Sequence, residues 1–561
     1  MRANKYKLIT ILSAVVLISG ACNKQLSPLL NNPSVASTSA ASPDLYLNSL
    51  QLNFKGFFQD ASDLSDQLVR QELMYGPTYY NAFAPTSFDD IWTKAYESIF
   101  LTANTMIPIA EGKQEYIHAG IAQVLKAYTM ITMVDLFGDV PYSQADLGVG
   151  NTNPVVDKGA DIYDSAVALL DSGIANFAKT ASVGPSNDIF YGGSGASWTA
   201  LAKTLLLKVY VQTRLVDNTA AAKITALITE NDLINTPAQD FVFAYSTHNQ
   251  APDSRSSHYV TNYGTDNGAG DYIGTYFLWC LRDDKPIPDP RTPYYVYRQI
   301  DDITNDPRLP NQTTTQFALA CYYRTDPYPA GVGYCIIDNS YWGRDHGNNE
   351  GIGPDNSLRS TWGIYPAGGA FDANQNTATG QSTGRITGAG GNGINPIWLS
   401  SYTYFLKAEA ALILSTPGDP LALTISGVDQ SFNKVAGFAS SIGYTLPTTD
   451  TNFLITPTKQ TQYENIVTNL YTSASTTAAK LNVIEKEYYL ATWGNGVEPY
   501  NNYRRTGCPN NMQPALYGNA GLFIRSFFYA SVYANYNKNA VQKTVTNVKV
   551  FWDTNPDNFV Q

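Results

Sequence analysis

One short segment of the chain collects side chains that suit the recognition of sugars or amides. It reads Tyr341-Trp342-Gly343-Arg344-Asp345-His346. The two aromatic rings offer flat faces for stacking, and the guanidinium, carboxylate and imidazole groups can hydrogen-bond to hydroxyl or amide groups. A loop packed by its own aromatic side chains is the alternative interpretation. We expect Tyr341, Trp342, Arg344, Asp345 and His346 to contact a ligand.

Two further aromatic clusters are weaker candidates for ligand binding. Tyr75, Tyr79 and Tyr80 lie in the segment MYGPTYYNAF, and Trp279 lies in a later segment. The whole chain has 39 Tyr, against 36 Lys plus Arg. Tyrosine joins a rigid apolar ring to a hydroxyl group, so it suits ligand binding, although we expect many of these rings in the core.

The composition argues against several kinds of site. The net charge of −11 disfavours nucleic acid, whose phosphate backbone needs a basic surface. There are only four His and no C-x-x-C spacing, so a centre built from His or Cys is not expected. Calcium could bind near Asp266, Asn267 and Asp271, or near Asp283 and Asp284, but neither set has the EF-hand spacing. The sequence predicts no cofactor and leaves a metal site open.

The chain begins with a pattern typical of an exported lipoprotein. Basic residues precede an uncharged, mostly apolar run from Leu8 to Ser19, and Gly20-Ala21-Cys22 follows. The run is too short to span a bilayer, so residues 1–21 are predicted to be a signal peptide and Cys22 the lipid-bearing residue. Ser19 departs from the usual Leu, so an ordinary secretory signal is the alternative. Residues 22–44 are polar and predict a flexible tether.

Four cysteines follow Cys22 in a chain that we expect to be exported. An oxidising compartment permits disulfides, and four cysteines allow three pairings among which the sequence does not decide. The four are Cys280, Cys321, Cys335 and Cys508.

The elements that must position these residues are mainly helices, and we expect a mostly α fold with little β-structure. Residues 45–235 and 396–493 show helical spacing, whereas residues 237–395 are rich in Gly, Pro, Asn, Asp and Tyr and predict a loop-rich insert within a single body, 45–561. Short connections favour helix pairs resembling an irregular tetratricopeptide array. The predicted helices are Leu45–Met74, Phe88–Ile109, Tyr116–Phe137, Asp161–Ala178, Trp198–Leu215, Ala220–Thr229, Pro396–Leu414, Gln430–Ser441, Gln462–Thr472 and Thr477–Trp493.

Two conspicuous motifs have adequate structural explanations. In LFGDVPY, Gly138 can end a helix in a left-handed conformation, Asp139 can accept backbone hydrogen bonds and Pro141 prevents the helix from continuing. Arg504 and Arg505 could bind a carboxylate or phosphate ligand. We favour buried ion pairs for them instead, because Glu498 lies close in sequence.

Five segments, in order along the chain, resemble the SusD/RagB-like family of nutrient-binding outer-membrane lipoproteins. Individually they are weak, but their order and the preceding lipoprotein signal make the resemblance specific. The Glu485–Pro509 block resembles one branch of the family in particular. The five segments are LKAYTMITMVDLFGDVPYSQA (Leu125–Ala145), NDPRLP (Asn305–Pro310), YFLKAEAAL (Tyr404–Leu412), EKEYYLATWGNGVEPYNNYRRTGCP (Glu485–Pro509) and VFWD (Val550–Asp553).

This resemblance implies a binding protein rather than an enzyme. Family members are anchored to the outer membrane by a lipid, face the cell exterior, and pass a captured glycan or peptide to a SusC-like TonB-dependent transporter. Their helix pairs form one side of the molecule, and a loop-rich half carries the ligand site. An oligosaccharide is the expected ligand here, and a peptide is the alternative within the family.

Two other functions compete with nutrient capture. An exported glycan hydrolase would need two carboxyl groups about 5–9.5 Å apart, but no motif singles out such a pair. There is also no G-x-S-x-G elbow followed by a suitable Asp and His. An adhesion or surface-layer protein would self-assemble or bind host proteins, and it would lack a small-ligand pocket.

Overall fold

The computed structural model describes residues 42–300, 341–349, 356–380 and 384–561. In these ranges the chain is mostly helical, and its strands form two antiparallel sheets of two strands each. The predicted fold class is confirmed. Within the same ranges, no helix is both long enough and apolar enough to cross a membrane.

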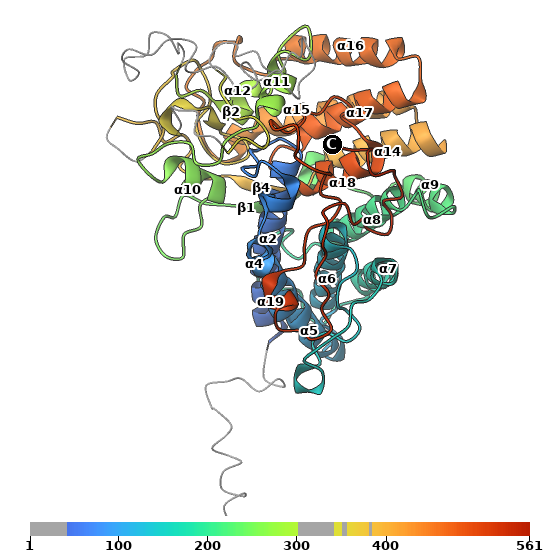
Figure 1. Ribbon diagram of the computed structural model, residues 1–561. Coiled ribbons are helices and arrows are strands. Elements are labelled where there is room, and N and C mark those ends of the chain that lie inside the picture. The colour runs from blue at the N-terminus through green and yellow to red at the C-terminus, as the bar shows by residue number, and fades with distance from the viewer. Residues whose placement is uncertain (1–41, 301–340, 350–355, 381–383) are drawn as a thin grey trace, which may run out of the picture.

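The first helical block packs consecutive helices side by side, as the predicted helix pairs require (Figure 1). The first helix ends at Leu68, before the predicted Met74, and Arg70 then adopts a left-handed φ of 63°. The predicted Phe88–Ile109 helix divides into two α-helices joined by a π-helical segment. The elements are α2 (Pro43–Leu68), α4 (Asp89–Thr93), η2 (Lys94–Phe100), α5 (Leu101–Gly112), α6 (Tyr116–Phe137), α7 (Gly159–Phe177), α8 (Gly195–Gln212) and α9 (Ala220–Glu230).

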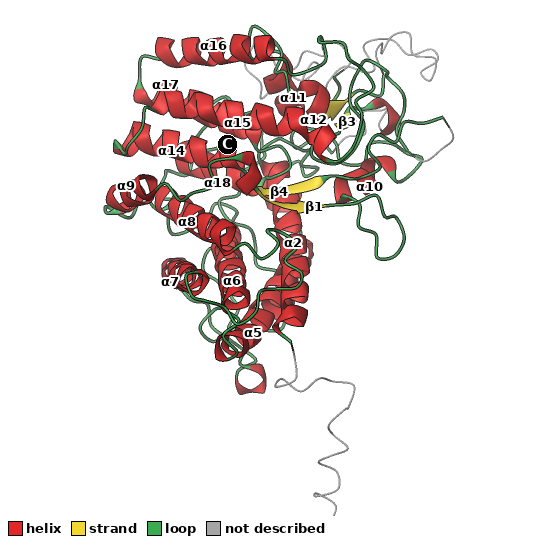
Figure 2. Ribbon diagram, turned by 180° about the vertical axis from the view of Figure 1, so that it is seen from behind, coloured by secondary structure: helices red, strands yellow, loops and turns green. Residues whose placement is uncertain are grey.

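The second helical block forms a layer of neighbouring helices, which Figure 2 shows from behind. It contacts the first block through α14 against α8 and through α18 against α2. Its helices are α14 (Ser400–Leu414), α15 (Pro420–Ser441), α16 (Pro457–Ser473), α17 (Thr477–Ala491) and α18 (Val497–Thr506).

Several features of this second block differ from the sequence expectation. The helix predicted from Pro396 begins at Ser400, because Ile394–Trp398 forms strand β4, which pairs with β1 (Phe241–Ala244). Helix α15 begins at Pro420, well before the predicted Gln430, since Asp419 caps its first turn and proline suits that position. Helix α18 was not predicted, because its side chains are mostly polar although they are buried.

The segment between the blocks contains short elements joined by loops. They are α10 (Ser257–Tyr263), α11 (Thr275–Arg282), α12 (Thr292–Tyr295), β2 (Val296–Tyr297) and β3 (Thr361–Trp362). Helices of one or two turns are too short to show a periodic pattern, which explains why the sequence predicted loops here. Together with the longer loops they form the irregular half of the molecule (Figure 1).

The LFGDVPY turn has the structural role expected from its sequence. Gly138 adopts a φ of 74° and ends α6, while its N–H donates to the carbonyl of Val134. The Asp139 carboxylate accepts a 2.8 Å hydrogen bond from the N–H of Gly159, at the start of α7. A single turn therefore ends one helix and fixes the beginning of the next.

Candidate functional site

The three aromatic clusters predicted from the sequence lie next to one another. The N–H of Arg344 donates to Ile273 O at 3.0 Å, and the N–H of Thr275 donates to Arg344 O at 2.9 Å. Gly347 N–H donates to Met74 O at 2.9 Å. The segment that begins at Tyr341 is therefore fixed by backbone bonds to the start of α11 and to the loop after α2.

Tyr75 has a half-exposed aromatic ring in this region. Its side chain is 51% exposed. The Tyr272 ring contacts it edge-on, with centroids 6.4 Å apart. The buried Arg344 guanidinium lies 5.8 Å from the Tyr75 centroid and 5.3 Å from that of Tyr272. The Arg344 guanidinium and the Tyr272 ring thus support Tyr75 from within the protein, while about half of its surface remains exposed. Tyr272 was not predicted from the sequence, because no local motif distinguishes it.

Tyr79 and His346 form a buried hydrogen-bonded pair. The Tyr79 hydroxyl lies 3.1 Å from Nε2 of His346 and accepts a hydrogen bond from Nη2 of Arg70 at 2.9 Å. Burial and the charge of Arg70 lower the pKa of His346 well below its usual value. A neutral His346 can therefore accept a hydrogen bond from the Tyr79 hydroxyl at Nε2. Asp345 is also buried, and its Oδ1 accepts from Gln513 Nε2 at 2.8 Å.

Tyr80 is the second exposed ring among the predicted residues. It is 57% exposed and contacts Phe528 edge-on, with centroids 5.4 Å apart. Both residues line a cavity of about 270 Å³ together with Lys543. Lys543 Nζ donates to the carbonyls of Phe137 and Phe527, while burial and Arg504 lower its pKa to about 7.

Trp342 and Tyr341 are buried, so their rings face protein. Trp342 has no exposed surface, and the Arg359 guanidinium lies 4.4 Å from its ring. The guanidinium groups of Arg282 and Arg298 lie 4.7 and 4.9 Å from the centroid of the Tyr341 ring. Direct ligand contact by these two residues remains a prediction.

Trp279 lies on α11 and is half-buried. Lys486 Nζ is 5.1 Å from its ring, and the Tyr276 ring contacts it at 5.9 Å between centroids. Of the nine predicted ligand-binding residues, Tyr75 and Tyr80 are the ones whose side chains are mainly exposed. Ligand contact by the whole set stays a prediction.

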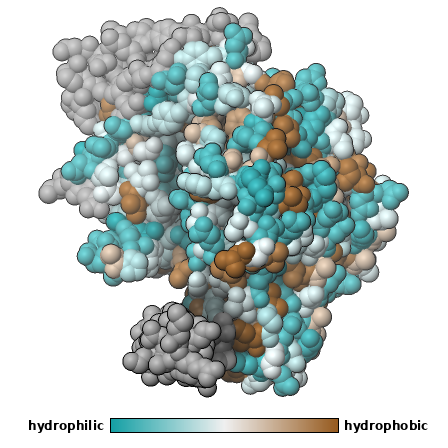
Figure 3. All heavy atoms as spheres, turned by 60° about the horizontal axis from the view of Figure 1, so that its bottom comes forward, coloured by the Kyte–Doolittle hydropathy of each residue, from teal (hydrophilic) through white to brown (hydrophobic). Residues whose placement is uncertain are grey.

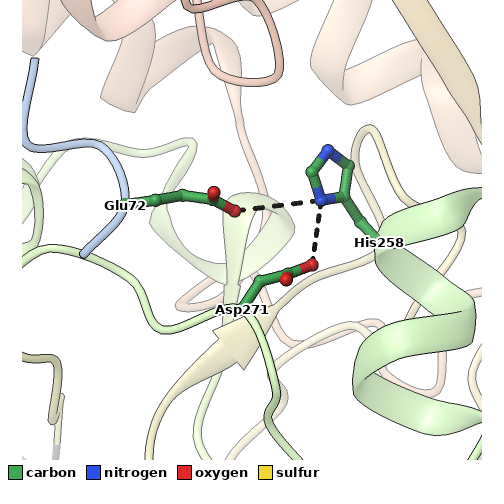
Figure 4. Close-up of side chains that lie close together, drawn as sticks. All are labelled: Glu72, His258 and Asp271. Atoms are coloured by element: carbon green, nitrogen blue, oxygen red, sulfur yellow. Dashed lines mark hydrogen bonds and ion pairs between the residues drawn. The ribbon is translucent and has the colours of Figure 1, made fainter. Parts of the chain in front are cut away.

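A largely buried group of titratable side chains comes together from three separate segments (Figure 4). His258 on α10 has Nδ1 3.1 Å from Asp271 Oδ2 and 3.8 Å from Glu72 Oε1. Its ring stacks on Trp362, with centroids 3.7 Å apart. Trp362 in turn donates its indole N–H to Glu72 Oε1 at 3.1 Å. Of these residues, only Asp271 was predicted as a candidate ligand from the sequence, because the other members come from distant segments.

The charges of this group are set by burial and by mutual attraction. Burial acts to lower the pKa of His258, but the carboxylates of Asp63, Asp271 and Glu72 outweigh it and raise the pKa well above its usual value. Burial, with the nearby charge of Asp271, raises the pKa of Glu72. These shifts favour a protonated His258 imidazole beside the Asp271 carboxylate.

The predicted cation sites can now be compared with this geometry. Glu72, His258 and Asp271 offer one nitrogen and two carboxylate oxygens within 4.8 Å of one another, which is close enough to ligate a metal ion. The imidazolium already supplies the positive charge that these carboxylates need, so an internal ion-pair cluster fits the arrangement. At the other predicted position, Asp284 accepts from Lys486 Nζ at 2.6 Å.

The paired arginines are structural, but Glu498 is not their partner. Arg505 forms a two-pronged ion pair with Glu409, at 2.9 and 2.6 Å, and Arg214 reaches the same carboxylate at 3.0 Å. Arg504 donates to Asn501 Oδ1 at 2.6 Å. Glu498 pairs instead with Lys208 at 2.7 Å. These buried groups tie α18 to α14 and α8, so they do not form an anion site.

Cys280 and Cys508 are free, buried thiols. Burial raises the pKa of each to about 12, so both remain protonated near neutral pH. Cys22, Cys321 and Cys335 lie outside the described residues, as does the predicted NDPRLP segment.

Comparisons with known proteins agree over most of the chain. A family model described as "Starch-binding associating with outer membrane" matches residues 36–308. A second, described as "Susd and RagB outer membrane lipoprotein", matches residues 370–552. No curated protein matches this chain.

Solved structures show the same fold. A SusD/RagB family protein from Bacteroides thetaiotaomicron VPI-5482 is 18% identical, with a TM-score of 0.66, over 92% of this chain and 100% of its own. A protein described as chitin-binding is 18% identical, with a TM-score of 0.63 and the same coverage of both chains. A chitin-binding SusD homologue from Flavobacterium johnsoniae is 17% identical, with a TM-score of 0.57, over 91% of this chain and 99% of its own. At these identities the likeness shows a shared architecture.

Proposed function

Because the chain belongs to the SusD/RagB family of outer-membrane lipoproteins, we propose that it captures an oligosaccharide at the cell surface. In this proposal it is a non-catalytic protein, anchored through a lipid on Cys22, that hands its ligand to a SusC-like TonB-dependent transporter. The two structural relatives described as chitin-binding support a glycan as the ligand.

The observation that carries the proposal is the pair of exposed rings in the segment that follows α2, Tyr75 and Tyr80. Exposed aromatic rings are costly to hydrate and pack well on the apolar faces of sugar rings. Arg344 lies beneath one ring, and Phe528 supports the other. Their supporting contacts limit side-chain motion, which lowers the entropy cost of binding.

The same surface would also accept aromatic side chains of a peptide, so the ligand class must be measured. Calorimetry with the mature chain carrying Cys22→Ala should use chito-, malto- and cello-oligosaccharides alongside Tyr- and Trp-containing peptides. We expect saturable binding of an oligosaccharide and recovery of the ligand intact by mass spectrometry. Selective peptide binding would instead identify a peptide-capturing protein, and released shorter products would identify a hydrolase.

Variants locate the binding surface. The double change Tyr75→Ala and Tyr80→Ala should weaken the affinity at least ten-fold, because stacking on each ring contributes on the order of 1 kcal/mol. Tyr404→Ala, at a half-buried tyrosine on α14, is the matched control and should leave the affinity unchanged. An unchanged affinity in the folded double variant would remove this surface from the ligand site.

A further inference from the structure

A second cavity lies in the helical half of the molecule. Its volume is about 480 Å³, which falls within the roughly 300–1,000 Å³ typical of small-molecule sites. Residues from α4 and η2, from the loop after Pro141, and from α19 (Ser531–Ala534) and the residues that follow it form its walls. Figure 1 shows α4, α5 and α19 together at the end of the molecule away from α11 and α12.

An aromatic stack forms one wall of this cavity. The Trp92 ring lies between Tyr96 and Tyr533, with centroid separations of 5.2 and 4.9 Å and interplanar angles of 29° and 20°. Trp92 is almost fully buried, whereas Tyr536 at the rim is 82% exposed. The cavity therefore has a rigid aromatic wall and one open ring at its mouth.

Carboxylate and amide side chains complete the lining. Glu97 and Asp146 provide carboxylates, and Asn151 and Asn537 provide amide groups. Asp146 adopts a left-handed φ of 59°, an uncommon conformation for a residue with a side chain. Among the described residues that line the cavity, none is Lys or Arg. Carboxylates accept hydrogen bonds from hydroxyl groups, whereas an anionic ligand would be repelled.

We propose that this cavity is a second carbohydrate site, which takes a short stretch of uncharged sugar. Aromatic faces suit the C–H surfaces of sugar rings, while the carboxylates and amides suit the hydroxyl groups around them. Figure 3 brings this end of the molecule forward and shows apolar side chains in separate small groups among hydrophilic ones.

The test places a spectroscopic reporter in the wall of the cavity. The mature chain carrying Cys22→Ala is labelled with 5-fluorotryptophan, and the ¹⁹F signal of Trp92 is assigned by its loss in Trp92→Phe. The probes are N,N′-diacetylchitobiose, maltose and cellobiose, with digalacturonate as the acidic probe. We expect at least one neutral disaccharide to shift the Trp92 signal saturably and digalacturonate to leave it unchanged.

Variants distinguish this site from the tyrosine surface. Ala145→Phe fills the cavity and should abolish the shift, and Tyr536→Ala should weaken the apparent affinity at least five-fold. Val541→Ala, at an 81% exposed position in the same tail segment, should change nothing. The double change at Tyr75 and Tyr80 should leave the Trp92 shift intact, whether or not the proposed function is correct.

Three results would overturn the proposal. The first is that no neutral disaccharide shifts the Trp92 signal. The second is that the shift survives Ala145→Phe in the folded protein. The third is that digalacturonate binds as well as the neutral probes, because the carboxylates would then not determine what the cavity accepts.

Discussion

The hydroxyl of Tyr79 lies 3.1 Å from Nε2 of His346, although the two residues are 267 positions apart in the sequence. This hydrogen bond joins the loop after α2 to the segment that begins at Tyr341. Arg70 Nη2 donates to the same hydroxyl, which can therefore donate its own proton to a neutral His346. The pair holds together two clusters that the sequence could identify only separately.

Tyr79→Phe should lower the free energy of unfolding by about 1–3 kcal/mol, because it leaves His346 Nε2 and one Arg70 donor buried without their partner. Urea denaturation measures the change. Tyr80→Phe, on the exposed neighbour, is the control and should be close to neutral. Equal effects of the two substitutions would show that the buried hydrogen bonds contribute little.

Trp342→Ala should lower the free energy of unfolding, whatever its effect on ligand affinity. Its ring is fully buried, and truncation of a buried aromatic side chain typically costs about 3–5 kcal/mol. The midpoint of denaturant unfolding should fall clearly. Trp342→Phe should retain most of the stability. An Ala variant as stable as the wild type would mean that the Trp342 ring contributes little packing energy in the wild-type protein.

Glu409→Gln should destabilise the junction between the helical blocks. Burial alone would raise the pKa of Glu409, but Arg505 and Arg214 outweigh it and lower the pKa to about 2. Removing the carboxylate charge leaves two buried guanidinium groups without it, which should cost about 3–5 kcal/mol in unfolding free energy. Glu230→Gln, at an exposed carboxylate paired with Lys203, should cost at most about 1 kcal/mol. Similar losses in both variants would contradict the structural role assigned to Arg505.

His258 should contribute a pH-dependent part of the stability. Its folded-state pKa is raised above the usual value of about 6.5, so its stabilisation is complete below about pH 6.5 and is lost as the pH rises through the raised pKa. The difference in unfolding free energy between the wild type and His258→Gln should therefore be larger at pH 6 than at pH 9. His248→Gln, at an exposed histidine, is the control. A difference that grows with pH would mean that His258 is buried neutral.

Cys22→Ala should release the protein from the membrane. Without the thiol there is no atom to carry the lipid, and no helix in the described part of the chain is long and apolar enough to span the bilayer. Fractionation of cells that express the variant should find it in the soluble fraction, whereas the wild type should sediment with membranes. Retention of the variant in membranes would indicate another means of attachment.

Local sequence determined most of the helical architecture. The apolar spacing in Tyr116–Phe137 predicted α6 with both of its ends, because helix formation depends on residues three or four positions apart and on the glycine that follows. The short helix α10 left no such signal. Strand β4 forms where the start of α14 was predicted, because it pairs with β1. Since β1 lies far away in the sequence, local spacing could not predict this pairing.

The sequence predicted which residue types form the candidate site, but it did not predict how their side chains are arranged. The sequence by itself identified the residue types that recognise ligands, and the order of five motifs that indicated the family. Tertiary structure alone decided that Tyr75 is exposed while Trp342 is buried, since exposure depends on what the rest of the chain places against each ring. It also decided the charge of His258, because its pKa depends on carboxylates brought from separate segments by folding.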